Sequence, residues 1–168
     1  MNYVTVYRAD MINGIGVRVT LFVSGCSRKC PGCFNQKAWS EDFGKPYTKD
    51  TEDAIIRYMQ APYVDGLTLL GGEPMEPTHQ EHVLNLITRV RKELPDKNIW
   101  LYSGYTLEEL RAMDTPYAKK ILSNVDVLVD GPFVQNLRDP DVPFRGSTNQ
   151  RVIDMRQTKN GDPVLLMP

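Results

Sequence analysis

Long hydrophobic runs are absent from this 168-residue sequence. Apolar stretches such as residues 21–23 are far too short to span a bilayer, and residues 1–10 lack both the charged start and the apolar stretch of a signal peptide. We therefore expect a cytoplasmic protein that does not enter a membrane. An excess of charge is also absent, because 20 basic residues stand against 21 acidic residues for a net charge of −1. No long-range attraction to nucleic acid follows, so nucleic acid is not an expected partner.

Cysteine and histidine are scarce, with three and two residues respectively. An odd number of cysteines cannot pair off completely, and a domain of this size does not need disulfides to be stable. All three cysteines fall within residues 26–33 with the spacing CxxxCxxC, in a loop that also carries Gly25 and Gly32. We therefore interpret Cys26, Cys30 and Cys33 as reduced thiols that bind a metal centre.

Three kinds of site are open to these thiols, because thiolate sulfur binds zinc, copper(I) and iron–sulfur clusters better than hard cations. A structural zinc site needs four ligands, and the two histidines, His79 and His82, lie about fifty residues away. A redox disulfide between Cys30 and Cys33 would leave Cys26 without a role. A [4Fe-4S] cluster uses all three thiolates and leaves one iron open to bind a substrate. The cluster is the favoured hypothesis, and zinc and the disulfide remain alternatives.

Strand-like and helix-like segments alternate along the chain, which predicts the α/β class with parallel strands joined by right-handed crossovers. Thr78 with Glu81, and Thr106 with Glu109, have the spacing of helix capping boxes. We expect one domain over residues 1–156 and a tail of uncertain order over 157–168, which is either an edge strand, a frayed end or a partner contact. A complete eight-unit barrel takes roughly 250 residues, so the prediction is a partial, open (β/α) barrel of about five or six parallel strands. The expected strands are residues 17–23, 66–70, 98–102 and 125–129, and the expected helices begin near residues 50, 78, 106 and 117.

Two motifs together resemble the pattern of radical S-adenosylmethionine enzymes: the CxxxCxxC loop after one strand and Gly71-Gly72-Glu73-Pro74 after the next. The resemblance implies that the open barrel is of the radical S-adenosylmethionine type and that the open iron chelates the amino and carboxylate groups of S-adenosyl-L-methionine. It also implies that the backbone of Gly71, Gly72 and Glu73 hydrogen-bonds the amino group of that cofactor. The reaction would be reductive cleavage of the cofactor to a 5′-deoxyadenosyl radical, with no catalytic side chain beyond cluster and cofactor.

Further segments, residues 13–18, 30–35, 127–133 and 145–150, resemble the family of activating proteins of anaerobic ribonucleotide reductase. The likeness runs from about Tyr3 to Arg156. It implies an enzyme that removes a Cα hydrogen from a glycine of the large reductase subunit, which is then its protein substrate, and that receives electrons from a donor such as a flavodoxin. An activase of another glycyl-radical enzyme, such as pyruvate formate-lyase, and a non-catalytic iron–sulfur or zinc module are the alternative functions.

Four further residues are candidates for cofactor binding, and the first three also have an ordinary structural alternative. Phe34 is a candidate for contact with the adenine, or else a core aromatic residue. Ser103 follows a strand and is a candidate for a ribose contact, or a turn serine. Asp130 ends a strand and would orient the cofactor, a cation or the glycine loop, or else is a solvated turn carboxylate. Asn149 would hydrogen-bond the cofactor or the incoming peptide.

Overall fold

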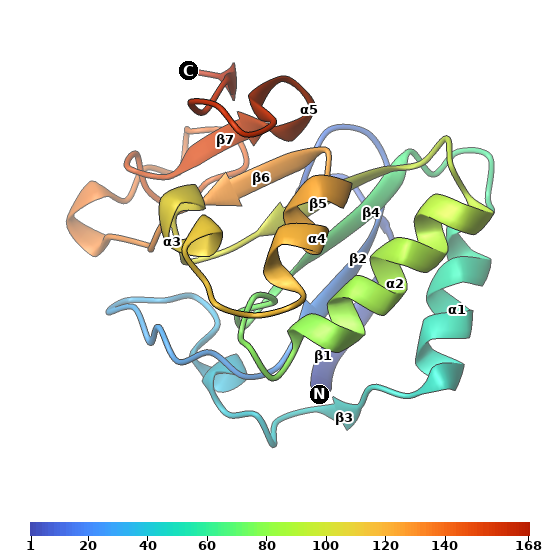
Figure 1. Cartoon of the computed structure of the whole chain (residues 1–168). Coiled ribbons are helices and arrows are strands. Elements are labelled where there is room, and N and C mark those ends of the chain that lie inside the picture. Colours follow the sequence, from blue (N-terminus) through green and yellow to red (C-terminus); the bar gives the residue numbers. More distant parts are fainter.

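The four strands expected from the sequence form the centre of one eight-stranded sheet in the computed structural model, which describes all residues 1–168 (Figure 1). The strand order is β3-β1-β2-β4-β5-β6-β7-β8. The strands are β1 (Asn2–Asp10), β2 (Arg18–Val23), β3 (Lys45–Pro46), β4 (Gly66–Gly71), β5 (Asn98–Tyr102), β6 (Val127–Asp130), β7 (Arg151–Asp154) and β8 (Leu165–Met167). The helices are α1 (Lys49–Met59), α2 (Gln80–Glu93), α3 (Leu107–Arg111), α4 (Ala118–Asn124) and α5 (Met155–Thr158), with 3-10 turns at η1 (Gln36–Trp39) and η2 (Gln135–Leu137).

The predicted partial barrel of five or six parallel strands is wrong, because the sheet is mixed. Of its seven strand pairings, only the three that join β2, β4, β5 and β6 are parallel, and the other four are antiparallel. The reason lies in the connections. Only a short loop, residues 11–17, joins β1 to β2, and residues 131–150 join β6 to β7 without an α-helix that could carry the chain back across the sheet. Both connections therefore return the chain in the opposite direction.

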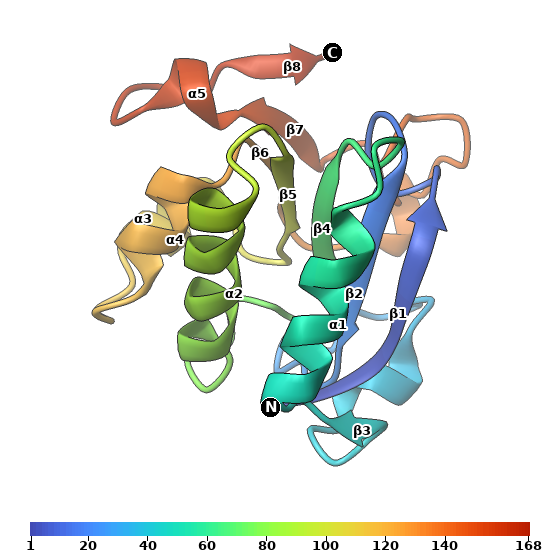
Figure 2. The same cartoon turned by 90° about the vertical axis from the view of Figure 1, so that its right-hand side faces the viewer.

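A row of leucines explains why the central strands align as they do. Leu21, Leu69, Leu101 and Leu128 are successive Cα partners across β2, β4, β5 and β6, and all four are buried. Their side chains belong to a core of 26 buried residues that includes apolar side chains of α1, α2 and α4. These helices cover one face of the sheet (Figure 2). None of the helices has the length and apolar character needed to cross a membrane.

The opposite face of the sheet is covered only in part. Trp100, Val127, Val129 and Val152 form a small second cluster there, against which Phe144 of the β6–β7 loop packs. Because the side chains of a strand alternate between the two faces, the residues next to the leucine row point to this second face. The remainder of the face is free to line a cavity at the carboxyl ends of the parallel strands.

One of the two predicted capping boxes is confirmed. In α3, Glu109 N donates to Thr106 Oγ1 (3.2 Å) and Thr106 N donates to Glu109 Oε2 (2.7 Å). The box predicted at Thr78 is wrong, because α2 begins at Gln80 after His79, and the Thr78 hydroxyl instead donates to a carboxylate of the η1–β3 segment.

Candidate iron–sulfur and cofactor site

The cysteine loop begins where β2 ends, and backbone hydrogen bonds hold both of its ends. Gly25 N donates to Ala38 O (2.8 Å), and Cys26 N donates to Trp39 O (3.1 Å), so η1 closes the loop behind the cysteines. Gly25 has φ +100°, a backbone conformation that residues other than glycine rarely adopt. A Cβ atom there would lie 2.9 Å from the ring of His79. All three cysteines are half-buried and unpaired.

The turn after β4 packs directly on this loop. Gly72 N donates to Val23 O (2.7 Å) and Glu73 N donates to Gly25 O (2.8 Å). A Cβ atom on Gly72 would lie 2.4 Å from Gly25 O, so only glycine allows the two backbone segments to approach this closely. The Gly71-Gly72-Glu73 turn is therefore a structural neighbour of the cysteines as well as a motif in the sequence.

The side chain of Glu73 points away from solvent and connects this turn to the segment after β5. It accepts hydrogen bonds from Ser103 Oγ (2.8 Å), Gly104 N (2.6 Å) and Met75 N (2.9 Å), and it is 1% exposed. Burial raises the pKa of Glu73 to about 7, although these hydrogen bonds favour the charged form. The carboxylate thus fixes the distance between the ends of β4 and β5.

A second acid of the same turn contacts the cysteine loop itself. Glu76 Oε1 accepts hydrogen bonds from both the backbone N–H and the hydroxyl of Ser27, each at 2.6 Å. The sequence analysis missed this residue, because neither its position in a turn nor its spacing from the cysteines marks it. His79, another unpredicted neighbour, pairs through Nδ1 with Glu73 O (2.8 Å).

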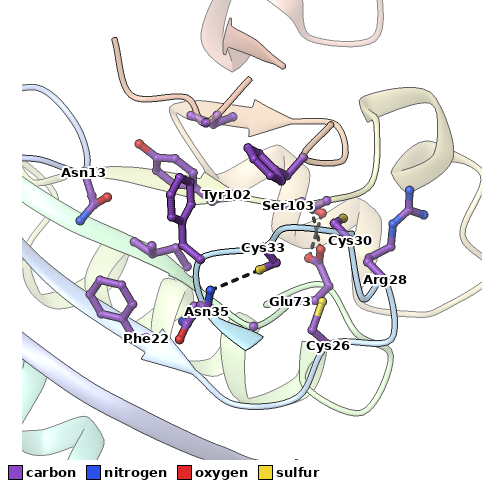
Figure 3. Close-up of a pocket in the computed structure, with 18 of the residues that line it drawn as sticks. Asn13, Phe22, Cys26, Arg28, Cys30, Cys33, Asn35, Glu73, Tyr102 and Ser103 are labelled. Carbon is purple, nitrogen blue, oxygen red and sulfur yellow. Dashed lines mark hydrogen bonds between the residues drawn. The ribbon is translucent and has the colours of Figure 1, made fainter. Parts of the chain in front are cut away.

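These loops surround a cavity of about 500 Å³ on the second face of the sheet (Figure 3). Cys26, Cys30 and Cys33 line it together with residues 71–73 and Ser103. The cavity extends along the sheet to Tyr102, whose hydroxyl is buried without a hydrogen-bond partner. Burial raises the pKa of Tyr102, so the hydroxyl keeps its proton and remains a donor. The indole N–H of Trp39, a further lining residue, also has no partner.

The four remaining candidates divide into two groups. Phe34 and Ser103 line the cavity. Phe34 is 71% exposed, and its ring centroid lies 5.5 Å from that of Phe133. Asp130, at the end of β6, and Asn149 do not line the cavity, although the next residue after each, Gly131 and Gln150, does.

Both of these residues bind protein groups instead. Asp130 is buried and accepts hydrogen bonds from Leu107 N (2.6 Å) and from the Arg151 guanidinium (2.9 and 2.5 Å). Asn149 Nδ2 donates to Pro132 O (2.8 Å). In this structure, Asp130 therefore connects β6 to α3 and β7.

The donor set fits an iron–sulfur cluster better than a single metal ion. No three His, Cys, Asp or Glu side chains converge closely enough to hold one ion. In a cubane each thiolate binds a different iron, so the thiols need to surround a shared space rather than meet at a point, and these three line one cavity. Burial raises the pKa of the Cys26 thiol, and the nearby carboxylates of Glu73 and Glu76 raise it further. A bound metal would offset this cost, because it stabilises the thiolate.

Comparison with known proteins agrees with this chemistry. A family model described as a 4Fe-4S single cluster domain matches residues 12–153, which supports the cluster over the zinc and disulfide alternatives. A protein of Vibrio cholerae is 49% identical over 152 residues, covering 89% of this chain and 96% of its own length. A protein of Escherichia coli K12 is 44% identical over 158 residues, covering 93% and 100%, and one of enterobacteria phage T4 is 39% identical over 152 residues, covering 90% and 93%. All three are named anaerobic ribonucleoside-triphosphate reductase-activating protein. The chain belongs to the family of anaerobic ribonucleoside-triphosphate reductase-activating proteins, and it carries that family's 4Fe-4S domain.

Proposed function

We propose that this chain cleaves S-adenosyl-L-methionine reductively at a [4Fe-4S] cluster bound by Cys26, Cys30 and Cys33, and so generates the glycyl radical of anaerobic ribonucleotide reductase. We assign this activity to residues 1–156 as one domain. The observation that carries the proposal is that the three thiols and the Gly71-Gly72-Glu73 turn line the same cavity. The names of the relatives support anaerobic ribonucleoside-triphosphate reductase as the protein substrate. That its large subunit receives the radical is part of the proposal and follows from the family resemblance.

The proposed reaction balances with one external electron. A cluster held by the three cysteines would supply that electron to the sulfonium, after receiving it from a low-potential donor protein such as a flavodoxin. Homolysis of the C5′–S bond would yield methionine and a 5′-deoxyadenosyl radical. Transfer of one hydrogen atom from a glycine Cα then yields 5′-deoxyadenosine and the glycyl radical.

The turn after β4 would bind the methionine end of the cofactor through its carbonyl oxygens. The backbone N–H of Gly72 already donates to Val23 O at the end of β2, and that of Glu73 donates to Gly25 O in the cysteine loop. Glu73 O accepts from Glu76 N and pairs with His79. The Gly72 carbonyl has no such partner, and a carbonyl is the group that can accept a hydrogen bond from an amino group.

Two other cavity residues have groups available to the nucleoside. The Ser103 hydroxyl donates to Glu73 and accepts from Tyr105 N (3.1 Å), so it would act toward a ribose as an acceptor through its second lone pair. Phe34 is exposed, and its ring would contact the adenine beside the Arg138 guanidinium, which lies 5.0 Å from the ring centroid. We propose indirect roles for the remaining candidates, in which Asp130 supports the end of β6 and Asn149 holds the loop that follows it.

Anaerobic reconstitution tests the proposal. The wild-type protein should contain about four irons and four acid-labile sulfides per chain and should release 5′-deoxyadenosine from S-adenosyl-L-methionine under dithionite. Cys26→Ser, Cys30→Ser and Cys33→Ser should each abolish this release, whereas Lys37→Ala, an exposed change in the same loop region, should leave it intact. An intact cluster without cleavage would mean a non-catalytic module and would refute the proposal.

The protein substrate is tested separately by electron paramagnetic resonance. After mixing with the large subunit of anaerobic ribonucleotide reductase, the spectrum should contain a glycyl radical. A radical formed only on pyruvate formate-lyase would move the assignment to the alternative activase.

A further inference from the structure

Glu76 is the one residue outside the cysteine loop whose carboxylate accepts hydrogen bonds from between the first and second cysteines. Ser27 follows Cys26 directly, and both its N–H and its hydroxyl donate to Glu76 Oε1 at 2.6 Å. Glu76 is 8% exposed and lies in the turn that also packs on Gly25. The contact therefore fixes the backbone at the point where the chain leaves Cys26.

The other contacts of this segment are longer, and the Arg28 guanidinium lies 4.5 Å from the centroid of the Tyr105 ring. Inside the loop, Cys33 N donates to Cys30 O (3.1 Å). The Ser27 hydroxyl lies 3.5 Å from Tyr105 Oη, and Arg28 reaches Glu109 only at 3.7 Å. The two hydrogen bonds to Glu76 are much shorter than these contacts. Removal of the Glu76 carboxylate should therefore make the segment between Cys26 and Cys30 more mobile.

The charge of Glu76 has a second consequence. Neither Glu76 nor the buried Glu73 has a basic side chain within ion-pair distance, and Glu76 contacts the residue that directly follows Cys26. A cluster at these cysteines gains one negative charge when it is reduced. A carboxylate close by and shielded from water makes that gain less favourable, since charge and hydrogen bonding around a cluster set its reduction potential.

We propose that Glu76 is a positioning residue that holds the cysteine loop in its cluster-binding conformation and lowers the reduction potential of the cluster. The inference rests on the cluster site of the proposed function. A low potential is what reductive cleavage of a sulfonium requires, so the two parts of the role serve the same reaction.

Matched variants separate the hydrogen bonds from the charge. Glu76→Gln keeps an oxygen acceptor and removes the charge, Glu76→Ala removes both, and Ser27→Ala removes one hydrogen bond and keeps the charge. Glu93→Gln is the control, because it removes one carboxylate charge from the exposed end of α2. Each is reconstituted anaerobically, assayed for iron and sulfide, and titrated to its midpoint potential by electron paramagnetic resonance.

We expect Glu76→Gln to retain its iron and to shift the midpoint to a more positive value. Glu76→Ala should show the same shift together with a loss of iron per chain. Ser27→Ala should shift less than Glu76→Gln, and Glu93→Gln should match the wild type. Cluster-free protein provides an independent measurement, in which the cysteines of Glu76→Ala should react with a maleimide several-fold faster than those of the wild type.

A Glu76→Gln midpoint equal to that of the wild type, or a Glu76→Ala protein with wild-type iron content and alkylation rate, would overturn the inference. If Glu76→Gln takes up no cluster, the maleimide alkylation rate of its cysteines tests the positioning role of Glu76. A rate equal to that of the wild type would again overturn the inference. Failure of the wild type to cleave S-adenosyl-L-methionine would instead refute the proposed function, while the effect of Glu76 on the midpoint would still be measurable.

Discussion

Replacement of Asp130 by asparagine distinguishes a structural carboxylate from a cofactor-binding one. Asp130 is 1% exposed, and three donors point at it: Leu107 N and two nitrogens of Arg151. The asparagine amide has one oxygen and one NH2 group, so at least one of these donors would face another donor. Removal of one partner of a buried ion pair costs about 3–5 kcal/mol, and the retained oxygen offsets part of this. We expect a loss of about 3 kcal/mol in the free energy of unfolding.

Urea denaturation of cluster-free protein measures this loss. With a slope of about 2 kcal/mol per molar urea, a loss of about 3 kcal/mol lowers the midpoint by about 1.5 M. Glu108→Gln is the matched control, because Glu108 pairs with the same Arg151 but its side chain is 57% exposed. An exposed pair contributes about 0–1 kcal/mol, so the control should unfold close to the wild type.

The reasoning would be refuted by an Asp130→Asn protein that unfolds like Glu108→Gln. If that protein also lost its affinity for S-adenosyl-L-methionine, measured by equilibrium dialysis with the cluster in place, the carboxylate would act on the cofactor after all. The ion pair with Arg151 would then be incidental to its role.

Three further changes test other contacts of the site. Burial raises the pKa of Glu73 from 4.5 to about 7, so between these pH values the folded protein holds a proton that the unfolded chain releases. The free energy of unfolding should therefore fall by about 3 kcal/mol as the pH rises from 4.5 to 7. The urea midpoint of the wild type should therefore fall more steeply with rising pH than that of Glu73→Gln. Equal pH dependence of the two midpoints would contradict the raised pKa. Gly72→Ala should lose most of its iron and sulfide, because its Cβ would lie 2.4 Å from Gly25 O; full loading would mean that the two loops can separate freely. Thr106→Ala should lower stability by about 1 kcal/mol in thermal unfolding, since it removes the cap that Glu109 N uses, and an unchanged midpoint would argue against the capping box.

The strands at the centre of the sheet were predictable because their signal is local. Residues 98–102 were expected as a strand and form β5 with those bounds, and the strand at Arg18–Val23 lies within the predicted range. β-branched and aromatic residues bounded by turn residues mark such segments without reference to the rest of the chain. β1 carries a similar local pattern of Val and Tyr residues over Asn2–Asp10, so this strand was also predictable, although it is not among the expected strands.

Strand direction was not predictable in the same way. Alternation of strands and helices favours parallel pairing, but β1 and β7 join their neighbours through loops, and loops allow either edge of a sheet to be extended in the antiparallel direction. The tail had been given several possible roles, and pairing of Leu165–Met167 with β7 makes it the edge strand. The direction of β1 and β7 and the pairing of β8 depend on which edges of the sheet remain unpaired after the central strands have formed the core.

The sequence by itself determined the donor chemistry of this protein, because three thiols within eight residues and a glycine turn after the next strand are fixed by covalent spacing. Only the tertiary structure decided which side chains support them. Glu76 reaches Ser27 and Asp130 turns to Arg151 because β4 lies beside β2, and β6 beside β7, at those points of the sheet. Hydrogen bonds between residues twenty to fifty positions apart depend on where the strands meet, and no local pattern of residues encodes that distance.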